Sequence, residues 1–306
     1  MDHRDDDNLG HEFPGYDGPR PERRVATAHR AFSYQERRRL VIRRRRVALA
    51  VALAVTFVVL LSGAAVLFAS CGKGHASVRK TGAASPSPSV SATADWTELR
   101  RPTQSDPLRF MTYGESVGDC LNFGLRVKCW DEPAIAFRQF AKPSSGLSRP
   151  DFFDWPRYLR RDMANKGFEA VVMMTGANDA QDVVVSGRKL KFPTKAWLET
   201  YHERVAEVMD LILDEGVARL YWVGMPDMGP VGFSEKMATL DRVYQEEAAL
   251  RAPRVEYFDS WKVLDSPSGG YVASYRQADG VHLNDAGSLK LGAAVLAQVK
   301  KDWHLR

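Results

Sequence analysis

Cysteine is scarce in this chain, with three among 306 residues: Cys71, Cys120 and Cys129. Neither the cysteines nor the seven histidines form a group with the ligand spacing of a zinc site. No glycine-rich loop of the phosphate-binding type occurs, and no repeat recurs at solenoid or propeller periods. The sequence therefore indicates no metal, no organic cofactor and no repeat architecture.

A basic excess is also missing outside the first 46 residues. The chain carries a formal charge of +5, and those 46 residues, with twelve arginines against eight acidic side chains, account for +4 of it. The remainder is nearly neutral and has no basic stripe that follows a phosphate backbone. We therefore expect no nucleic-acid partner.

One long apolar run covers residues 47–69, which are 23 residues without a charged side chain. This length is enough to cross the roughly 30 Å hydrocarbon core of a bilayer. Seven arginines between residues 37 and 46 precede the run, and such charges favour the cytoplasmic side. We predict one transmembrane helix in the cell membrane, a cytoplasmic amino terminus and an extracytoplasmic domain.

A cleaved signal peptide is the alternative. The residues Phe68-Ala69-Ser70-Cys71 are similar to a lipoprotein cleavage box that ends in the lipidated cysteine, although Phe68 stands where leucine is usual. The 46-residue leader and the 23-residue apolar run both exceed those of an ordinary signal peptide. An uncleaved anchor is favoured, lipidation at Cys71 stays open, and either one places the domain outside.

Two polar segments flank the apolar run. Residues 1–46 are poor in aliphatic side chains, so we predict a disordered basic cytoplasmic tail. Residues 70–107 contain alternating serine and proline near residue 86 and are predicted to form an extended linker. The folded domain is predicted to span residues 108–306.

Within that domain, apolar runs that each end at a glycine alternate with helical patterns. The runs cover 109–113, 170–175 and 219–223, and helical spacing marks 195–215 and 285–303. This alternation is typical of a three-layer α/β/α sandwich with a central parallel sheet. Functional residues in such sheets lie at the carboxyl ends of the strands.

Polar residues stand at two of these turns and near the end of the chain. They are Gly114-Glu115-Ser116, Gly176-Ala177-Asn178-Asp179 and Asp279-Gly280-Val281-His282. In this order they resemble the sequence blocks of the SGNH/GDSL hydrolase superfamily, whose fold is flavodoxin-like. Further blocks extend the resemblance to a domain-of-unknown-function branch typical of bacterial envelope proteins: 146–156, 221–226 and 257–261.

The resemblance implies a role for each residue. Ser116 is the nucleophile, His282 its general base and Asp279 the group that orients the base. The backbone N–H groups of Ser116 and Gly146 and the amide of Asn178 form the oxyanion hole. The chemistry agrees, because a serine hydroxyl needs a histidine to take its proton, and that histidine needs an acceptor to fix its tautomer. Asn178 as a turn former and Asp179 as a helix cap are structural alternatives compatible with these roles.

Two features depart from the superfamily pattern. Glu115 stands where the family usually has aspartate, and Gly118-Asp119-Cys120-Leu121 copies the signature block with cysteine in place of serine. Cys120 is therefore an alternative nucleophile, although only Ser116 follows a strand at the required offset. In an oxidising compartment we expect a disulfide between Cys120 and Cys129, with two free thiols as the alternative.

These expectations combine into a membrane-anchored extracytoplasmic serine esterase or O-acyltransferase. Its expected substrates are small acyl esters, and the predicted location favours esters carried by cell-envelope glycans. A membrane protein that donates acyl groups is a further expected partner. Two alternatives stay open. One is a catalytically silent SGNH fold that binds glycans or acts as a scaffold, and the other is a regulator acting through the cytoplasmic tail.

Overall fold

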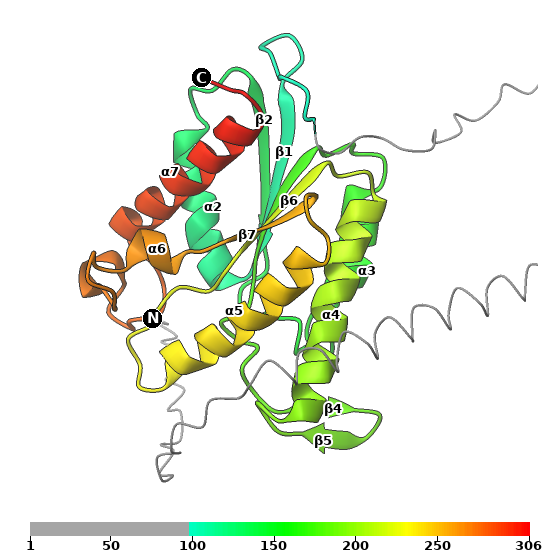
Figure 1. The fold of residues 1–306 in the computed structure, drawn as a ribbon, viewed down its shortest axis with the longest axis vertical. Coiled ribbons are helices and arrows are strands. Elements are labelled where there is room, and N and C mark those ends of the chain that lie inside the picture. Colours follow the sequence, from blue (N-terminus) through cyan, green and yellow to red (C-terminus); the bar gives the residue numbers. More distant parts are fainter. Residues whose placement is uncertain (1–97) are drawn as a thin grey trace, which may run out of the picture. The chain divides into compact units, whose positions relative to one another are not determined.

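The computed structural model describes residues 98–306 (Figure 1). Its centre is a sheet of five parallel strands in the order β2-β1-β3-β6-β7. This is the flavodoxin-like order, and it confirms the predicted parallel sheet. The strands are β1 (Leu108–Gly114), β2 (Ile135–Ala141), β3 (Ala170–Met174), β6 (Arg219–Val223) and β7 (Val255–Phe258).

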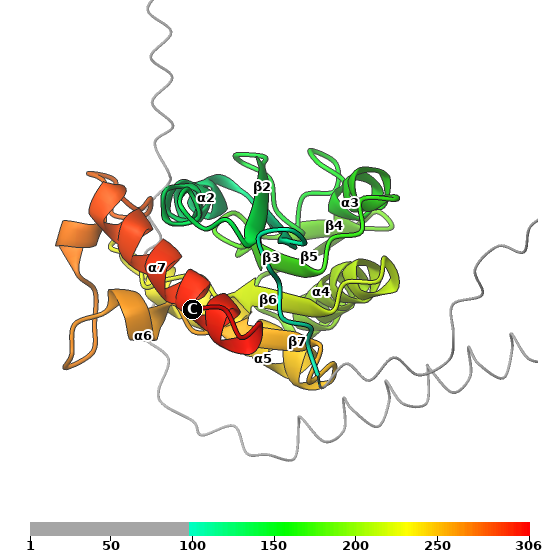
Figure 2. The same cartoon turned by 90° about the horizontal axis from the view of Figure 1, so that it is seen from above.

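Helices cover both faces of the sheet and complete the three layers (Figure 2). One face carries α2 (Ser116–Lys128), α6 (Trp261–Leu264) and α7 (Asp285–Asp302). The other face carries α3 (Trp155–Met163), α4 (Lys195–Asp214) and α5 (Phe233–Ala249). The predicted α/β/α sandwich is thus present in the described residues.

The burial of each strand follows from its place in the sheet. All five residues of β3 are buried, as are four of the five in β6, because helices pack on both faces. The edge strand β2 has one buried residue, Ile135, among seven. Its sequence, IAFRQFA, therefore lacks the continuous apolar run that identifies a central strand.

Helices α2 and α7 approach each other closely through two glycines. A β-carbon on Gly124 would lie 1.9 Å from the carbonyl oxygen of Ser288, and one on Gly292 would lie 2.5 Å from the carbonyl carbon of Gly124. No side chain fits at either position. These glycines therefore fix the spacing of the two helices, one beginning at Ser116 and the other following His282.

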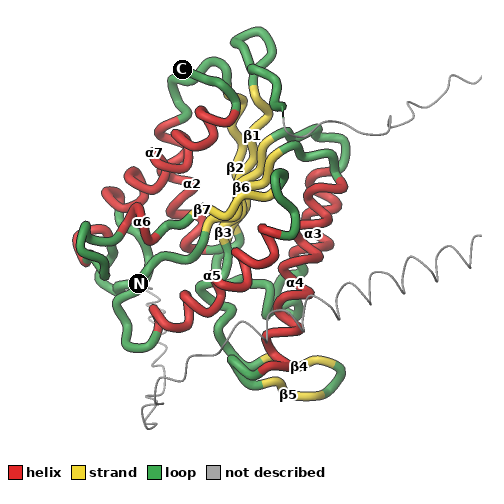
Figure 3. Tube along the Cα trace, viewed as in Figure 1, coloured by secondary structure: helices red, strands yellow, loops and turns green. Residues whose placement is uncertain are grey.

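A small antiparallel hairpin interrupts the connection between β3 and α4. It consists of β4 (Val183–Val185) and β5 (Arg188–Leu190) and projects beyond the lower end of α4 (Figure 3). A short 3₁₀ turn, η1 (Ala273–Tyr275), lies in the long loop between α6 and α7. That loop also carries Asp279 and His282.

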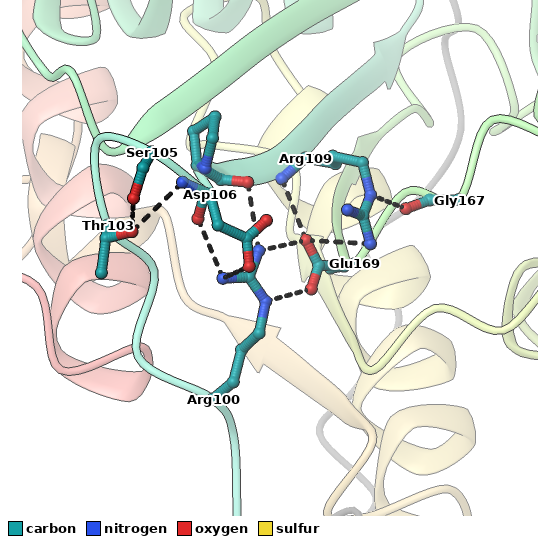
Figure 4. Close-up of polar contacts among 8 residues, drawn as sticks. Arg100, Thr103, Ser105, Asp106, Arg109, Gly167 and Glu169 are labelled. Carbon is teal, nitrogen blue, oxygen red and sulfur yellow. Dashed lines mark hydrogen bonds and ion pairs between the residues drawn. The ribbon is translucent and has the colours of Figure 1, made fainter.

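The segment that leads into β1 is tied to the sheet by ion pairs (Figure 4). The Arg100 Nε and Nη2 atoms lie 2.6 and 2.8 Å from the two carboxylate oxygens of Glu169, just before β3. Glu169 also accepts from the backbone N–H of Arg109 at 3.2 Å. Burial raises the pKa of Glu169, but the bonds from Arg100 and Arg109 outweigh it and the net pKa is lowered. This contact lies at the amino-terminal ends of the strands.

The predicted tail, the predicted transmembrane helix and most of the predicted linker lie outside the described residues. Among residues 98–306, no helix has the length and apolar character needed to cross a bilayer.

Candidate active site

The predicted functional residues come together at the carboxyl ends of the strands. Ser116 is the first residue of α2, directly after β1 and Glu115. Asn178 and Asp179 follow β3 in the same way, since the strand ends at Met174. Asp279 and His282 lie in the loop that precedes α7. Sequence positions up to 166 residues apart thus form one site.

Ser116, His282 and Asp279 form a continuous hydrogen-bonded chain. The Ser116 Oγ lies 2.9 Å from the His282 Nε2, and the His282 Nδ1 lies 2.6 Å from the Asp279 Oδ2. Because the carboxylate accepts a hydrogen bond from the Nδ1–H group, the lone pair of Nε2 faces the serine hydroxyl. This is the geometry that a serine nucleophile and its base require.

The Asp279 carboxylate is held as the charged form by its surroundings. Its second oxygen, Oδ1, accepts from the backbone N–H groups of Val281 and His282 at 2.9 and 3.0 Å. Partial burial raises the pKa of Asp279, but the bonds from His282 and from the two backbone groups outweigh burial, so the net pKa lies below the ordinary value. Asp279 therefore stays an acceptor for the imidazole across the neutral pH range.

The amino terminus of α2 adds a favourable field at the nucleophile. Ser116 occupies the first helical position, where the unpaired N–H groups give the helix a partial positive charge. An anion that develops on an acyl group attacked by Ser116 would lie near this end of the helix. The helix thus supports the oxyanion role predicted for the backbone N–H of Ser116.

Asn178 links the two other parts of the predicted oxyanion hole. Its Nδ2 donates to the carbonyl oxygen of Ser145 at 3.0 Å and approaches the Glu115 Oε2 at 3.4 Å. These acceptors directly precede Gly146 and Ser116 in the chain. The structure therefore brings Ser116, Gly146 and Asn178 into one neighbourhood.

Asp179 holds the Gly146 turn in place and caps no helix, so the helix-cap interpretation was wrong. Its carboxylate accepts from the backbone N–H groups of Leu147 and Ser148 at 3.0 and 2.7 Å, and from the hydroxyl of Tyr201 at 2.7 Å. Burial raises its pKa, and these bonds oppose the rise. Its Oδ1 would lie 2.2 Å from a β-carbon on Gly146, so only glycine fits there.

Glu115, the departure from the family pattern, is completely buried beside the nucleophile. Its Oε2 accepts from the Ser116 hydroxyl at 2.9 Å and caps α2 by accepting from the Val117 N–H at 3.1 Å. Its Oε1 is buried and has no hydrogen-bond partner among the described residues. Burial raises the pKa of Glu115 to about 7.

The predicted disulfide is wrong, because Cys120 and Cys129 are both free. Cys120 lies within α2, and Cys129 caps its carboxyl end. The two residues are nine positions apart along the helix, so their Cα atoms are about 13.5 Å apart, whereas a disulfide needs less than about 7 Å. The sequence prediction rested on the compartment expected for the domain and had no information on the distance between the two Cα atoms.

Cys120 is also poorly placed as the nucleophile. Its Sγ lies 3.5 Å from the backbone carbonyl of Ser116, whereas the His282 imidazole bonds to the Ser116 hydroxyl. Burial raises the pKa of Cys120 to about 11, so the reactive thiolate is disfavoured. Within residues 98–306, no group of histidine, cysteine or acidic side chains is arranged to hold a metal ion.

Comparison with known proteins gives a family and a set of similar structures. A family model described as "Protein of unknown function (DUF459)" matches residues 109–298. No curated protein matches the chain.

Solved structures that match include a lipase/acylhydrolase from Enterococcus faecalis, with 18% identity, 63% of this chain and 96% of that chain covered, and a TM-score of 0.45. A GDSL-like lipase from Bacteroides thetaiotaomicron has 14% identity, coverage of 66% and 92%, and a TM-score of 0.47. A peptidoglycan O-acetylesterase has 14% identity, coverage of 56% and 49%, and a TM-score of 0.40.

The family match confirms the resemblance predicted from the motifs, including its branch of unknown function, and covers nearly the same residues. The identities and TM-scores of the solved structures are too low to carry a conclusion about activity. The activity has to be inferred from the residues of the site.

Proposed function

Because this chain belongs to the DUF459 family, whose function is unknown, we propose its activity from the site itself: a serine esterase or O-acyltransferase. The single observation that carries the proposal is the chain of contacts from Ser116 through His282 to Asp279, with distances of 2.9 and 2.6 Å. A structural serine and a loop histidine have no need for this alignment. A serine nucleophile and its base require it.

In the first half of the reaction, His282 Nε2 takes the hydroxyl proton as the Ser116 Oγ bonds to the carbonyl carbon of an acyl ester. The carbonyl π electrons move to oxygen and form a tetrahedral oxyanion. As the oxyanion collapses, the bond to the leaving alkoxide breaks, and His282 delivers its proton to that alkoxide. The products are a free alcohol and an acyl group on Ser116.

In the second half, water or a sugar hydroxyl attacks the acyl-enzyme. His282 removes the proton of the attacking group, the new ester or acid leaves, and the proton returns to the Ser116 Oγ. Attack by water gives an esterase, and attack by a sugar gives an O-acyltransferase. Asp279 keeps the imidazole in the correct tautomer throughout.

Stabilisation of the oxyanion is assigned to the N–H groups of Ser116 and Gly146 and to the Asn178 amide, whose long 3.4 Å contact with the Glu115 Oε2 has to open for this role. The loss of one such donor typically lowers the rate by about 100-fold or more. Asp179 stabilises the backbone of this oxyanion hole, since its carboxylate accepts from the two N–H groups that follow Gly146. Its role is to hold the turn in place.

The substrate is proposed from the expected location of the domain. A membrane anchor at residues 47–69 would place the domain outside the cytoplasm, where the polysaccharides of the cell envelope carry acyl esters on sugar hydroxyls. The Arg100–Glu169 contact and the active site lie at opposite ends of β1, about 20 Å apart for a seven-residue strand. The described chain therefore enters the domain at the end of the sheet opposite to the active site. A membrane protein that supplies the acyl group would fit the transferase alternative.

A silent glycan-binding or scaffold module is the second candidate. One observation favours it: Glu115 also accepts from the Ser116 hydroxyl, which draws the proton away from His282.

Fluorophosphonate labelling and p-nitrophenyl acetate hydrolysis by the full chain in detergent test the two candidates. We expect Ser116→Ala to abolish labelling and to lower hydrolysis by a factor of about 1,000 or more. Cys120→Ala serves as the matched control and should retain both. Activity that survives in Ser116→Ala contradicts the nucleophile assignment. Absence of labelling in the unchanged protein at every pH favours the silent module.

A further inference from the structure

We propose that Glu115 controls the reactivity of Ser116: its carboxyl group competes with His282 for the hydroxyl proton of Ser116 and must be neutral for attack. This inference rests on the proposed serine esterase or acyltransferase function. It explains why a glutamate lies completely buried beside the nucleophile of this chain.

The first support is the competition for one proton. The Ser116 hydroxyl has a single hydrogen, and two acceptors lie at the same distance from its oxygen. The His282 Nε2 and the Glu115 Oε2 are each 2.9 Å away. A charged carboxylate is the stronger acceptor of the two, so ionised Glu115 holds the hydroxyl proton. His282 then cannot remove that proton as Ser116 attacks.

The second support is the unpaired oxygen of the same carboxyl. Glu115 Oε2 accepts from Ser116 and Val117 and is approached by the Asn178 Nδ2 at 3.4 Å, whereas the buried Oε1 meets no donor among the described residues. A buried carboxylate with one bare oxygen is costly in its charged form. The neutral acid is therefore accessible near neutral pH, in agreement with the burial that raises the pKa of Glu115 to about 7.

The surroundings of Glu115 are predominantly acidic or neutral. Titratable groups on four neighbouring segments face this part of the site: Cys120 on α2, Asp179 after β3, Tyr244 on α5, and His282 with Asp279 before α7. The negative charge of Asp179 adds to the rise in the pKa of Glu115, after burial. Neutralisation of Glu115 removes one of two adjacent buried negative charges.

The direction of the effect follows from these contacts. Below its pKa, Glu115 is neutral, and the Ser116 hydroxyl donates to His282. Above its pKa, ionised Glu115 binds the hydroxyl proton, and its negative charge opposes the oxyanion that forms beside it. The reaction rate should therefore fall on the alkaline side, where an ordinary serine hydrolase with a neutral histidine stays active.

The experiment measures the second-order rate of fluorophosphonate labelling of the full chain between pH 5 and pH 9. For the unchanged protein we expect the rate to fall by up to tenfold per pH unit above the apparent pKa, as for one ionisation. Glu115→Gln keeps the size and the helix cap but cannot ionise. It should label at least tenfold faster than the unchanged protein at pH 9 and within about threefold of it at pH 5.5.

Two further variants distinguish ionisation of Glu115 from a general loss of charge or structure. Asp119→Asn removes an exposed carboxylate from the first turn of the same helix and should keep the alkaline decline. Glu115→Asp retains an ionisable group and should also keep a decline, at a shifted pH. Loss of the decline in either variant overturns the assignment to Glu115.

The remaining outcomes separate this inference from the proposed function. If Ser116-dependent labelling shows no alkaline decline, or if the decline persists in Glu115→Gln, the role of Glu115 is overturned and the nucleophile assignment stands. If the unchanged protein is not labelled at any pH, the proposed function fails, and the role of Glu115 fails with it.

Discussion

Two neighbouring turns of this protein each bury a carboxyl group completely, but the two groups differ in their hydrogen bonds. Asp179, after β3, accepts from two backbone N–H groups and a tyrosine hydroxyl. Glu115, after β1, accepts through one oxygen only and leaves the other bare. Burial raises the pKa of both groups. The difference between the turns lies in how the donors are distributed: three donors cover both oxygens of Asp179, whereas Ser116, Val117 and Asn178 all approach one oxygen of Glu115.

The comparison separates structural from reactive carboxylates within one site. A buried charge with its full set of donors stabilises the backbone around it, and its removal leaves those donors unpaired. A buried acid with one unpaired oxygen is less stable in its charged form, so its pKa rises towards neutral pH and it can change protonation state during function. The Asp179 carboxylate thus fixes the Gly146 turn, whereas the Glu115 carboxyl group, in our proposal, controls the reactivity of Ser116.

The largest effect is expected for Asp179→Ala. This change leaves the N–H groups of Leu147 and Ser148 and the hydroxyl of Tyr201 without their acceptor, at about 1–3 kcal/mol for each buried group. We expect the free energy of unfolding, measured with urea, to fall by roughly 3–5 kcal/mol. Asp119→Ala, on the exposed side of α2, is the control and should change it by no more than about 0.5 kcal/mol. An equally small change for Asp179→Ala would show that its hydrogen bonds do not stabilise the turn.

A smaller effect of opposite sign is expected for Glu115→Gln. The pKa of Glu115 is raised on folding, so its ionisation destabilises the folded chain progressively from about pH 4.5 to about pH 7 and by a constant amount above. The variant should therefore be more stable than the unchanged protein at pH 8, by roughly 3 kcal/mol at most, and nearly equal at pH 4. Unfolding curves at the two pH values measure the difference. An equal increase in the free energy of unfolding at pH 4 and at pH 8 would show that the effect comes from packing and not from the charge of Glu115.

The smallest effect concerns the two cysteines of the described residues. Because they are free thiols on one helix, a reducing agent should leave the thermal unfolding midpoint unchanged. Thiol titration of the unfolded chain without reductant should detect both Cys120 and Cys129. A disulfide across so short a loop would instead contribute about 2 kcal/mol or more, which reduction would remove.

The interior of the fold could be predicted from sequence because burial on both faces imposes long apolar runs. The runs at 109–113, 170–175 and 219–223 correspond to β1, β3 and β6, and the helical pattern at 195–215 corresponds to α4. The predicted closing helix at 285–303 corresponds to α7. The edge strand β2 was not predicted, because only one of its seven residues is buried and its sequence forms no continuous apolar run.

The site could be predicted only as far as residue types reveal chemistry. Ser116, His282 and Asp279 stand at strand-end and loop positions where motifs are recognisable, and the structure brings them within hydrogen-bond distance. The bonds of Asp179 to the backbone of residues 147 and 148 left no such signal, because any residue can offer a backbone N–H. The disulfide prediction failed for a related reason: it required the path of the chain between the two cysteines.

The glycine contact between α2 and α7 couples two parts of the catalytic machinery that lie 166 residues apart in the sequence. Ser116 begins α2, and the loop that carries His282 leads into α7. Because neither Gly124 nor Gly292 has room for a β-carbon, a larger residue at either position would push the two helices apart. A substitution at this helix contact would therefore separate the nucleophile from its base without changing either residue.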